Sequence, residues 1–240
     1  MRWLQRAWAA WLIKSQGRLA REIAWRVARK HPIFHWARLG QVRFDSELLD
    51  VGCGSGGLLR RMRQYGFTRL AAVDPYLAAE PDEPGLRIAR AELAAVNGKF
   101  DLITMHHVLE HLAEPVAALT LARERLRAGG RILVRIPVAG SFAYREYGAD
   151  SCHLDAPRHP CIPSVRGLNY LAQRAGLRVL HLEFDGTHLV FRMSDSYRRD
   201  IPSLQAPLWN RAIRAYYRRR AARLNREGEG DTGVFVLGVD

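Results

Sequence analysis

The chain has 240 residues, of which 48% are hydrophobic and 25% charged, with a formal net charge of +13 at pH 7. This length suits one large domain or a domain with appendages, and the apolar content is sufficient for a core. Three scattered cysteines argue against a disulfide framework and favour a reducing compartment, and no apolar run approaches the roughly 20 residues of a membrane-spanning helix.

The positive charge is concentrated in two flanks. Residues 1–44 carry ten Lys/Arg and one acid, and residues 198–226 carry nine Arg and one acid, which leaves the rest of the chain net negative. Basic flanks are typical of segments that contact an anionic surface. Arginine is preferred over lysine throughout the chain, so a purely compositional origin of this charge stays open.

Residues 1–30 predict amphipathic helices. Apolar residues return every three or four positions among basic residues, as in Trp3, Leu4, Trp8, Trp11 and Leu12. A basic helix with aromatic residues can lie in a membrane interface, but the same period describes a helix that packs on its own domain. Pro32 and Gly40 mark breaks before the core. We therefore expect residues 1–44 to form a basic amphipathic helical extension.

Residues 47–65 predict a strand, a glycine turn and a helix. A short apolar run (47–51) leads into four glycines within six residues, and helical spacing resumes over 57–65. Glycines let a ligand approach the backbone, and the amide groups at the helix start face that ligand. The spacing matches both G-x-G-x-G and the dinucleotide form G-x-G-x-x-G, so the turn alone does not identify a cofactor.

The following residues alternate between strand and helix patterns. We expect strands at 69–73, 86–89, 100–105, 131–136, 177–184 and 234–239, and helices at 115–127, 164–175 and 203–227. The glycine pair 129–130 is expected to end the first of these helices. Strands joined by helical crossovers predict an α/β fold with a doubly wound, mostly parallel sheet.

Two segments stand out from this alternation. Residues 138–163 are rich in aromatic residues, His and Pro, and long loops in compact domains are usually functional, so we expect an active-site loop there. Residues 203–227 form a basic helical insertion. Because residues 227–233 are a short polar turn and not a linker, residues 45–240 are expected to form one domain.

Two acids flank the glycine turn. Asp74 ends the second predicted strand, where a carboxylate can accept hydrogen bonds from two ribose hydroxyls. Asp50 directly precedes the turn, where it would repel the pyrophosphate of a dinucleotide. S-adenosylmethionine carries an ammonium and a sulfonium group and no phosphate, so an acid suits it better. This pair favours the methyl donor over NAD, which stays an alternative.

The chain resembles the class I S-adenosylmethionine-dependent methyltransferases over about residues 45–184. Five motifs in the family's order carry the resemblance: Leu49–Gly56, Val73–Pro75, Phe100–Ile103, Val108–Leu112 and Leu126–Gly130. It is most similar to the branch with quinone-biosynthesis O-methyltransferases and enzymes of cell-surface polysaccharide clusters. The resemblance implies a Rossmann-like, seven-stranded sheet whose last strand, 234–239, is antiparallel and inserted between the two strands before it.

The resemblance also implies the cofactor contacts. The glycines would face the methionine part, Asp74 the ribose, Glu92 the adenine amine and Leu93 its ring. The segment after residue 104 would close over the cofactor. The expected cofactor-binding set is therefore Asp50, Gly52, Cys53, Gly54, Gly56, Asp74, Pro75, Glu92, Leu93, Met105 and His106. Glu92 also fits a solvated acid at a helix start, and Cys53 a small filler in the turn.

Methyl transfer needs a base only when the acceptor must lose a proton. His159 with Asp155 is the expected catalytic pair, because their loop should overhang the site. The alternative is a structural network that holds this loop. His111 is expected to be structural. The spacing of Cys152, His153, His159 and Cys161 does not match a zinc site, so no metal is expected.

Together these features predict an enzyme that methylates O or N of a small or lipid-linked acceptor. The chain lacks a signal-peptide pattern, so we expect a cytoplasmic protein that contacts the anionic inner face of the membrane. The alternatives are an RNA methyltransferase, against which the absence of a recognisable RNA-binding module argues, and a non-catalytic cofactor-binding protein. The variable segments that would build the acceptor pocket do not name the acceptor.

Overall fold

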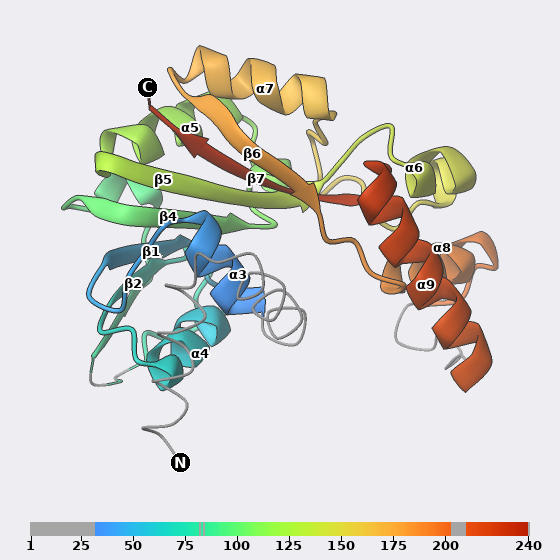
Figure 1. Ribbon diagram of the computed structural model, residues 1–240, viewed down its shortest axis with the longest axis horizontal. Helices are drawn as coiled ribbons and strands as arrows, with labels where there is room; N and C mark the ends of the chain where they lie inside the picture. Colours follow the sequence, from blue (N-terminus) through green and yellow to red (C-terminus); the bar gives the residue numbers. More distant parts are fainter. Residues whose placement is uncertain (1–31, 82, 84, 203–209, 240) are drawn as a thin grey trace, which may run out of the picture.

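The computed structural model describes residues 32–81, 83, 85–202 and 210–239. Its centre is a seven-stranded sheet in the order β3-β2-β1-β4-β5-β7-β6 (Figure 1). The strands are β1 (Glu47–Val51), β2 (Arg69–Val73), β3 (Leu86–Ala89), β4 (Phe100–His106), β5 (Leu126–Pro137), β6 (Arg178–Phe184) and β7 (Thr232–Gly238). The expected helices at 1–30 and the segment 203–209 lie outside the described residues.

The sheet confirms the predicted mixed topology. β1 pairs in parallel with β2 and β4, while β7 pairs antiparallel with both β5 and β6. The last strand of the chain is thus inserted between the two strands before it. Every residue of β7 is buried, as expected for a central strand covered on both faces.

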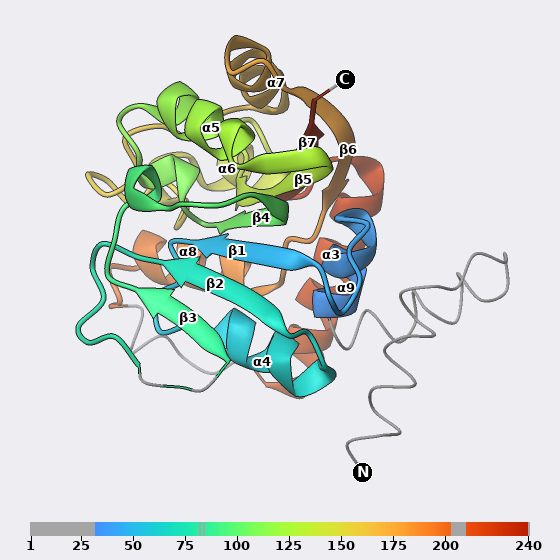
Figure 2. The ribbon, with the colours of Figure 1, turned by 90° about the vertical axis from the view of Figure 1, so that its left-hand side faces the viewer.

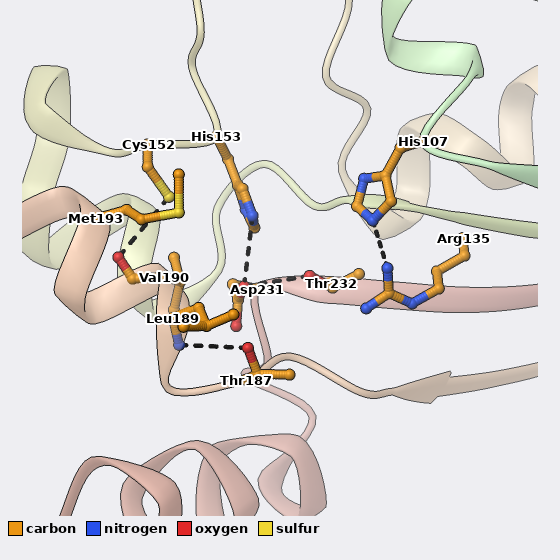
Figure 3. Close-up of a pocket in the computed structure, with 10 residues that line it drawn as sticks. All are labelled: His107, Arg135, Cys152, His153, Thr187, Leu189, Val190, Met193, Asp231 and Thr232. Atoms are coloured by element: carbon orange, nitrogen blue, oxygen red, sulfur yellow. Dashed lines mark hydrogen bonds and ion pairs between the residues drawn. The ribbon is translucent and has the colours of Figure 1, made fainter. Parts of the chain in front are cut away.

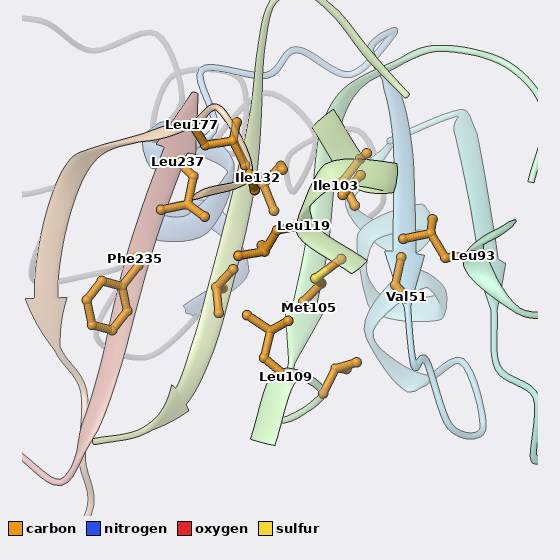
Figure 4. Close-up of a cluster of buried hydrophobic side chains, with 14 of the residues drawn as sticks. Val51, Leu93, Ile103, Met105, Leu109, Leu119, Ile132, Leu177, Phe235 and Leu237 are labelled. Carbon is orange, nitrogen blue, oxygen red and sulfur yellow. The ribbon is translucent and has the colours of Figure 1, made fainter. Parts of the chain in front are cut away.

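Helices cover both faces of the sheet (Figure 2). The described helices are α3 (Pro32–Leu39), α4 (Gly57–Tyr65), α5 (Pro115–Glu124), α6 (Phe142–Tyr147), α7 (Val165–Arg174), α8 (Leu189–Arg198) and α9 (Arg211–Glu227). α3 and α4 pack on one face, where Ile33 and Met62 join a cluster with strand residues. α5 and α7 pack on the other face, where Leu119 contributes to the larger cluster shown in Figure 4. No helix among the described residues is long and apolar enough to cross a membrane.

A third apolar cluster joins α6, α8 and α9 into a helical cap at one end of the sheet (Figure 1). Phe191 of α8 is 1% exposed and lies 5.1 Å from the ring of Tyr217 of α9. The guanidinium of Arg220 lies over Phe191 and over Phe142 of α6, at 5.2 and 4.7 Å from the ring centroids. One arginine of the basic insertion therefore holds the cap together.

α3 lies between the two predicted breaks, since it begins at Pro32, a residue well tolerated in the first turn of a helix, and ends at Leu39 before Gly40. Two other helices differ from the prediction. Residues 138–163 are not wholly irregular, because Ser141 caps the short helix α6 by accepting a hydrogen bond from the amide of Tyr144. α8 was not predicted, since its buried Ser194 and Ser196 interrupt the apolar pattern that marks a packed helix face.

The glycine pair at 129–130 does not end a helix. α5 ends at Glu124 and β5 already begins at Leu126, so both glycines lie inside the strand. The pairing shifts there, because Phe100 pairs with Leu126 whereas Leu102 pairs with Arg131. Gly129 has a φ of 74°, so the glycines allow the irregular strand backbone that this shift requires.

Candidate functional site

The predicted site residues gather where the parallel strands end. The glycine turn follows β1, Asp74 follows β2 and His107 follows β4. Because parallel strands present their carboxyl ends at one edge, these three segments share the same side of the sheet. This edge is the usual ligand site of doubly wound sheets.

The glycine turn is built from left-handed backbone. Gly52, Gly54 and Gly56 have φ values of 68°, 50° and 76°, a region that side-chain-bearing residues rarely adopt. A Cβ atom at Gly52 would lie 2.5 Å from Cγ2 of Val108, whereas a Cβ atom at Gly54 would meet nothing within 4 Å. Gly52 thus allows tight packing against the segment after β4, and Gly54 leaves open space beside the backbone.

Asp74 holds the glycine turn. Its Oδ2 accepts a hydrogen bond from the amide of Gly54, and its Oδ1 accepts one from the amide of Tyr76, both at 2.8 Å. Each carboxylate oxygen keeps a second lone pair, so ribose hydroxyls can still bind there. The side chain of Tyr76 is 91% exposed beside this carboxylate.

Asp50 is a buried acid beneath the turn. It is 3% exposed, and its Oδ1 accepts a hydrogen bond of 2.7 Å from Oγ1 of Thr104. Burial and, to a smaller extent, the negative charge of Asp74 raise the pKa of Asp50 to about 7, although the hydrogen bond from Thr104 lowers it. Burial and the same two acids raise the pKa of Cys53 to about 12, so this thiol stays protonated and fits a filler of the turn.

Asp50 predicts a pH-dependent affinity for a cationic ligand. Because its pKa in the fold lies above its ordinary value of 3.8, the ligand-free protein loses stability as pH rises from about 4 through 7. A nearby ligand cation favours the carboxylate, so affinity for S-adenosylmethionine should rise with pH, approaching tenfold per unit below about pH 7. Calorimetric titration at pH 5.5–8 tests this. Asp50→Asn should flatten the profile, and an unchanged slope in that variant would contradict the assignment.

The other residues expected to bind the cofactor differ in burial and in their contacts. Glu92 is exposed just after β3, and Leu93 is 9% exposed in the cluster under the sheet edge. Met105 is fully buried in the same cluster, so only its backbone can face a ligand. Burial, followed by the charge of Arg135, lowers the pKa of His106 to about 3, and its ring lies 4.4 Å from that of Trp36 of α3.

His159 and Asp155 do not form the expected hydrogen-bonded pair. Nε2 of His159 lies 3.8 Å from Oδ2 of Asp155, which is too long for a hydrogen bond. Asp155 instead pairs with Arg158 at 2.7 Å. Nδ1 of His159 lies 2.6 Å from the carbonyl oxygen of His153, so Nδ1 carries the proton and a backbone carbonyl orients the ring. The His159 ring also lies 4.6 Å from that of His111, beyond the end of β4.

A cavity of about 200 Å³ opens between the sheet edge and the helical cap (Figure 3). One wall is largely apolar and includes Leu189, Val190 and Met193 of α8. The other wall is polar and is formed by His107, Arg135, His153, Asp231 and Thr232, with Cys152 between the two. Thr187 lies beside the apolar wall, where its Oγ1 accepts a hydrogen bond from the amide of Leu189. The two walls come from segments far apart in the chain.

Most of the residues that line this cavity were not predicted from the sequence. Arg135 interrupts an apolar strand, which is the one local signal of a polar contact there. Its Nε donates to Oδ2 of Asp185 at 2.7 Å, and its guanidinium also contacts His107. Burial raises the pKa of Asp231 to about 6, and Oδ2 of Asp231 lies 3.7 Å from Nε2 of His153. Arg135 and Asp231 thus place opposite charges on one wall.

Residues 3–182 match a family model described as a methyltransferase domain. A ubiquinone biosynthesis O-methyltransferase of Cereibacter sphaeroides (strain ATCC 17025) is 36% identical over 93 residues, which are 35% of this chain and 38% of the relative. A tRNA U34 carboxymethyltransferase of Alcanivorax borkumensis is 35% identical over 99 residues, 36% of this chain and 31% of the relative. The chain thus spans less than two fifths of the length of these relatives.

Solved structures share the fold at low sequence identity. A mycolic acid cyclopropane synthase complexed with SAH and CTAB has a TM-score of 0.55 and 17% identity, and the match covers 88% of this chain and 84% of that one. A SAM-dependent methyltransferase of Archaeoglobus fulgidus has a TM-score of 0.53 and 17% identity, with 90% and 93% covered. These likenesses support the Rossmann-like architecture.

Proposed function

The chain belongs to the class I S-adenosylmethionine-dependent methyltransferases, and on this premise we propose that it methylates an oxygen or nitrogen atom of a small or lipid-linked acceptor. The observation that carries the choice of cofactor is the glycine turn with its two acids. Gly54 leaves open space for a ligand, and Asp50 supplies negative charge beside the place where the pyrophosphate of a dinucleotide would lie. Asp74 can accept hydrogen bonds from ribose hydroxyls.

The cavity supports an amphipathic acceptor with a head about the size of one ring. An apolar cavity of about 150 Å³ is known to hold benzene, so about 200 Å³ suits a single substituted ring. Arg135 and Asp231 can hydrogen-bond hydroxyl groups on one side of such a ring. Leu189 and Met193 can contact an apolar substituent on the other side. A relative that is named for ubiquinone biosynthesis agrees with this class of acceptor.

The bound cofactor supplies an electrophilic methyl group, and the residues of the chain position both reactants. The glycine turn and Asp74 hold the cofactor at the carboxyl ends of β1 and β2. His159 is the proposed base, because its Nδ1–H faces the carbonyl oxygen of the cavity-lining His153 and its Nε2 keeps a lone pair. The His159 side chain itself lies outside the cavity lining, so this role requires the acceptor to extend toward it. Asp155 would then act on the loop through Arg158. Unchanged turnover in His159→Ala would remove this role.

The acceptor proposal predicts that filling the cavity impairs acceptor use alone. Leu189→Trp should lower kcat/KM for a dihydroxyphenyl acceptor with a prenyl tail by about tenfold or more, because the indole occupies the ring site. Affinity for S-adenosylhomocysteine should not change. The matched control is Leu180→Trp on β6, since Leu180 is 42% exposed and Leu189 43%. Radiolabelled methyl transfer measures kcat/KM for both variants. Equal losses of kcat/KM in the two variants would contradict the assignment.

The membrane contact is proposed for α9. Its exposed residues include Arg211, Arg214, Arg218, Arg219, Arg223 and Arg226, and two apolar side chains, Ile213 and Tyr216, are 41% and 60% exposed among them. Basic residues near an anionic bilayer contribute about 1 kcal/mol each. The arrangement suits a helix that lies on the membrane surface, where a lipid-linked acceptor would be found.

Vesicle binding tests this contact. Arg218→Glu with Arg219→Glu should reduce co-sedimentation with vesicles of 30% phosphatidylserine by about tenfold or more. The control is Arg61→Glu with Arg63→Glu on α4, which makes the same change of net charge at exposed positions. Equal binding by both variants would contradict a role for α9. Salt-sensitive binding of RNA without vesicle binding would instead favour an RNA methyltransferase.

A further inference from the structure

Three side chains outside the cavity lining converge beyond the end of β4. They are Glu110 and His111, in the turn η2 (Leu109–His111), and His159 of the active-site loop. One potential ligand atom from each residue lies within 4.8 Å of the other two. The sequence places His159 forty-eight residues after His111, so only the fold brings the three together.

The hydrogen bonds of the two histidines leave the Nε2 atom of each ring available to bind a ligand. Nδ1 of His111 lies 2.9 Å from the carbonyl oxygen of Arg158, and Nδ1 of His159 lies 2.6 Å from that of His153. Carbonyl oxygens only accept, so Nδ1 carries the proton in both rings, and each neutral ring keeps a lone pair on Nε2. A backbone carbonyl on the far nitrogen is the usual support of a metal-binding histidine.

Glu110 adds an oxygen that lacks a partner. Its side chain is fully buried, and Oε1 pairs with Nδ1 of His107 at 3.0 Å. Oε2 is also buried and has no hydrogen-bond partner within the described part of the chain. A buried carboxylate oxygen without a partner is costly, and a nearby cation would remove that cost.

We propose that Glu110, His111 and His159 bind a divalent transition-metal ion, of which zinc is the first to test. Two imidazoles and one carboxylate form a known zinc ligand set with an open fourth position. Bonds of about 2.0–2.1 Å in a tetrahedron require ligand atoms about 3.4 Å apart, so the side chains would draw together when the ion binds. The expectation of no metal rested on Cys152, His153, His159 and Cys161, a different set that shares only His159.

The site would control the acceptor cavity. His107 and His153 both line the cavity. His107 is hydrogen-bonded to Glu110, and the carbonyl oxygen of His153 is hydrogen-bonded to His159. An ion would therefore tie the active-site loop to the end of β4 and fix the polar wall. This role rests on the proposed function, whereas ion binding does not. In the metal-loaded protein, His159 is a ligand and not the base.

The test uses the full chain without a histidine tag. After chelator treatment and dialysis, zinc is titrated in competition with a chromophoric chelator, and bound metal is counted by mass spectrometry. We expect one zinc per chain. His111→Ala with His159→Ala should weaken binding by about 100-fold or more. Glu110→Gln, which keeps the shape of the buried side chain, should also weaken it. The control is His181→Ala, since His181 is an exposed histidine on β6 outside the cluster.

Two results would overturn the proposal. One is a wild-type chain that takes up no stoichiometric zinc, manganese or cobalt. The other is binding that survives in the double variant or in Glu110→Gln. A thermal shift with S-adenosylhomocysteine, measured on every variant without metal, reports the cofactor site and folding separately. If that shift is kept while metal binding fails, the metal proposal falls and the proposed function stands.

Discussion

Gly52→Ala is expected to cost about 2–5 kcal/mol of folding stability and most of the affinity for the cofactor. A φ of 68° costs a side-chain-bearing residue about 1–2 kcal/mol, and the methyl group would lie 2.5 Å from Cγ2 of Val108. Overpacking of this kind adds about 1–3 kcal/mol. Because the turn must move to relieve the contact, its amides leave their positions. Chemical denaturation and calorimetric titration with S-adenosylhomocysteine measure the two losses.

Two further variants separate strain from packing. Val108→Ala in the Gly52→Ala background removes the contacted methyl group, so part of the lost stability should return. Gly54→Ala should lose stability through strain alone, because its Cβ would meet nothing within 4 Å, yet it should weaken cofactor binding by occupying the open space. If Gly54→Ala bound the cofactor as tightly as the wild type, the ligand would not lie against this turn.

Asp74→Asn is expected to lower kcat/KM by about 100-fold or more. The carboxylate accepts hydrogen bonds from the amides of Gly54 and Tyr76, and an asparagine can accept through only one of its two side-chain atoms. One of these part-buried hydrogen bonds to a charged group is therefore lost, at a cost of about 1.5–3 kcal/mol, and the charged acceptor for the ribose is lost as well. Turnover and affinity for S-adenosylhomocysteine should fall together.

Glu80→Gln is the matched control for Asp74→Asn. Oε1 of the exposed Glu80 also accepts a hydrogen bond from a backbone amide, that of Arg90, at 2.6 Å. Its replacement tests whether any carboxylate-to-amide contact near these strands affects catalysis. We expect turnover within about twofold of the wild type, because an exposed amide regains water as a partner. A loss as large as that of Asp74→Asn would make the effect structural and not specific to the cofactor.

The strands were predictable because their signals are local. The boundaries of β1 and β2 follow short apolar runs that end at Gly52 and Asp74, and such runs are characteristic of strands buried on both faces. In the edge strand β3, the buried Leu86 and Ile88 flank the exposed Arg87. α4 and α7 were also predicted from local patterns, at residues 57–65 and 164–175. The glycine turn and Asp74 could be placed at one edge because parallel strands end together.

The helical cap was not predictable from local pattern. Phe142 and Tyr147 of α6 and Phe191 of α8 pack in one cluster with α9. Arg220, which the sequence presents as one more basic residue, lies over the rings of Phe142 and Phe191. The same limit applies to the expected catalytic pair. Asp155 and His159 are spaced for contact, but Arg158 between them takes the carboxylate.

By itself, the sequence determined the α/β class and the glycine turn expected to receive the cofactor, and the family resemblance implied where the last strand is inserted. These features depend on the spacing of apolar residues and on glycines that adopt positive φ. Both signals are carried by residues close together in the sequence. Only the tertiary structure decided which side chains meet beyond the sheet edge. The cavity of Arg135, Leu189 and Asp231 and the cluster of Glu110 with two histidines join residues dozens of positions apart. Their contacts come from the packing of the loop and cap on the sheet, which no local spacing encodes.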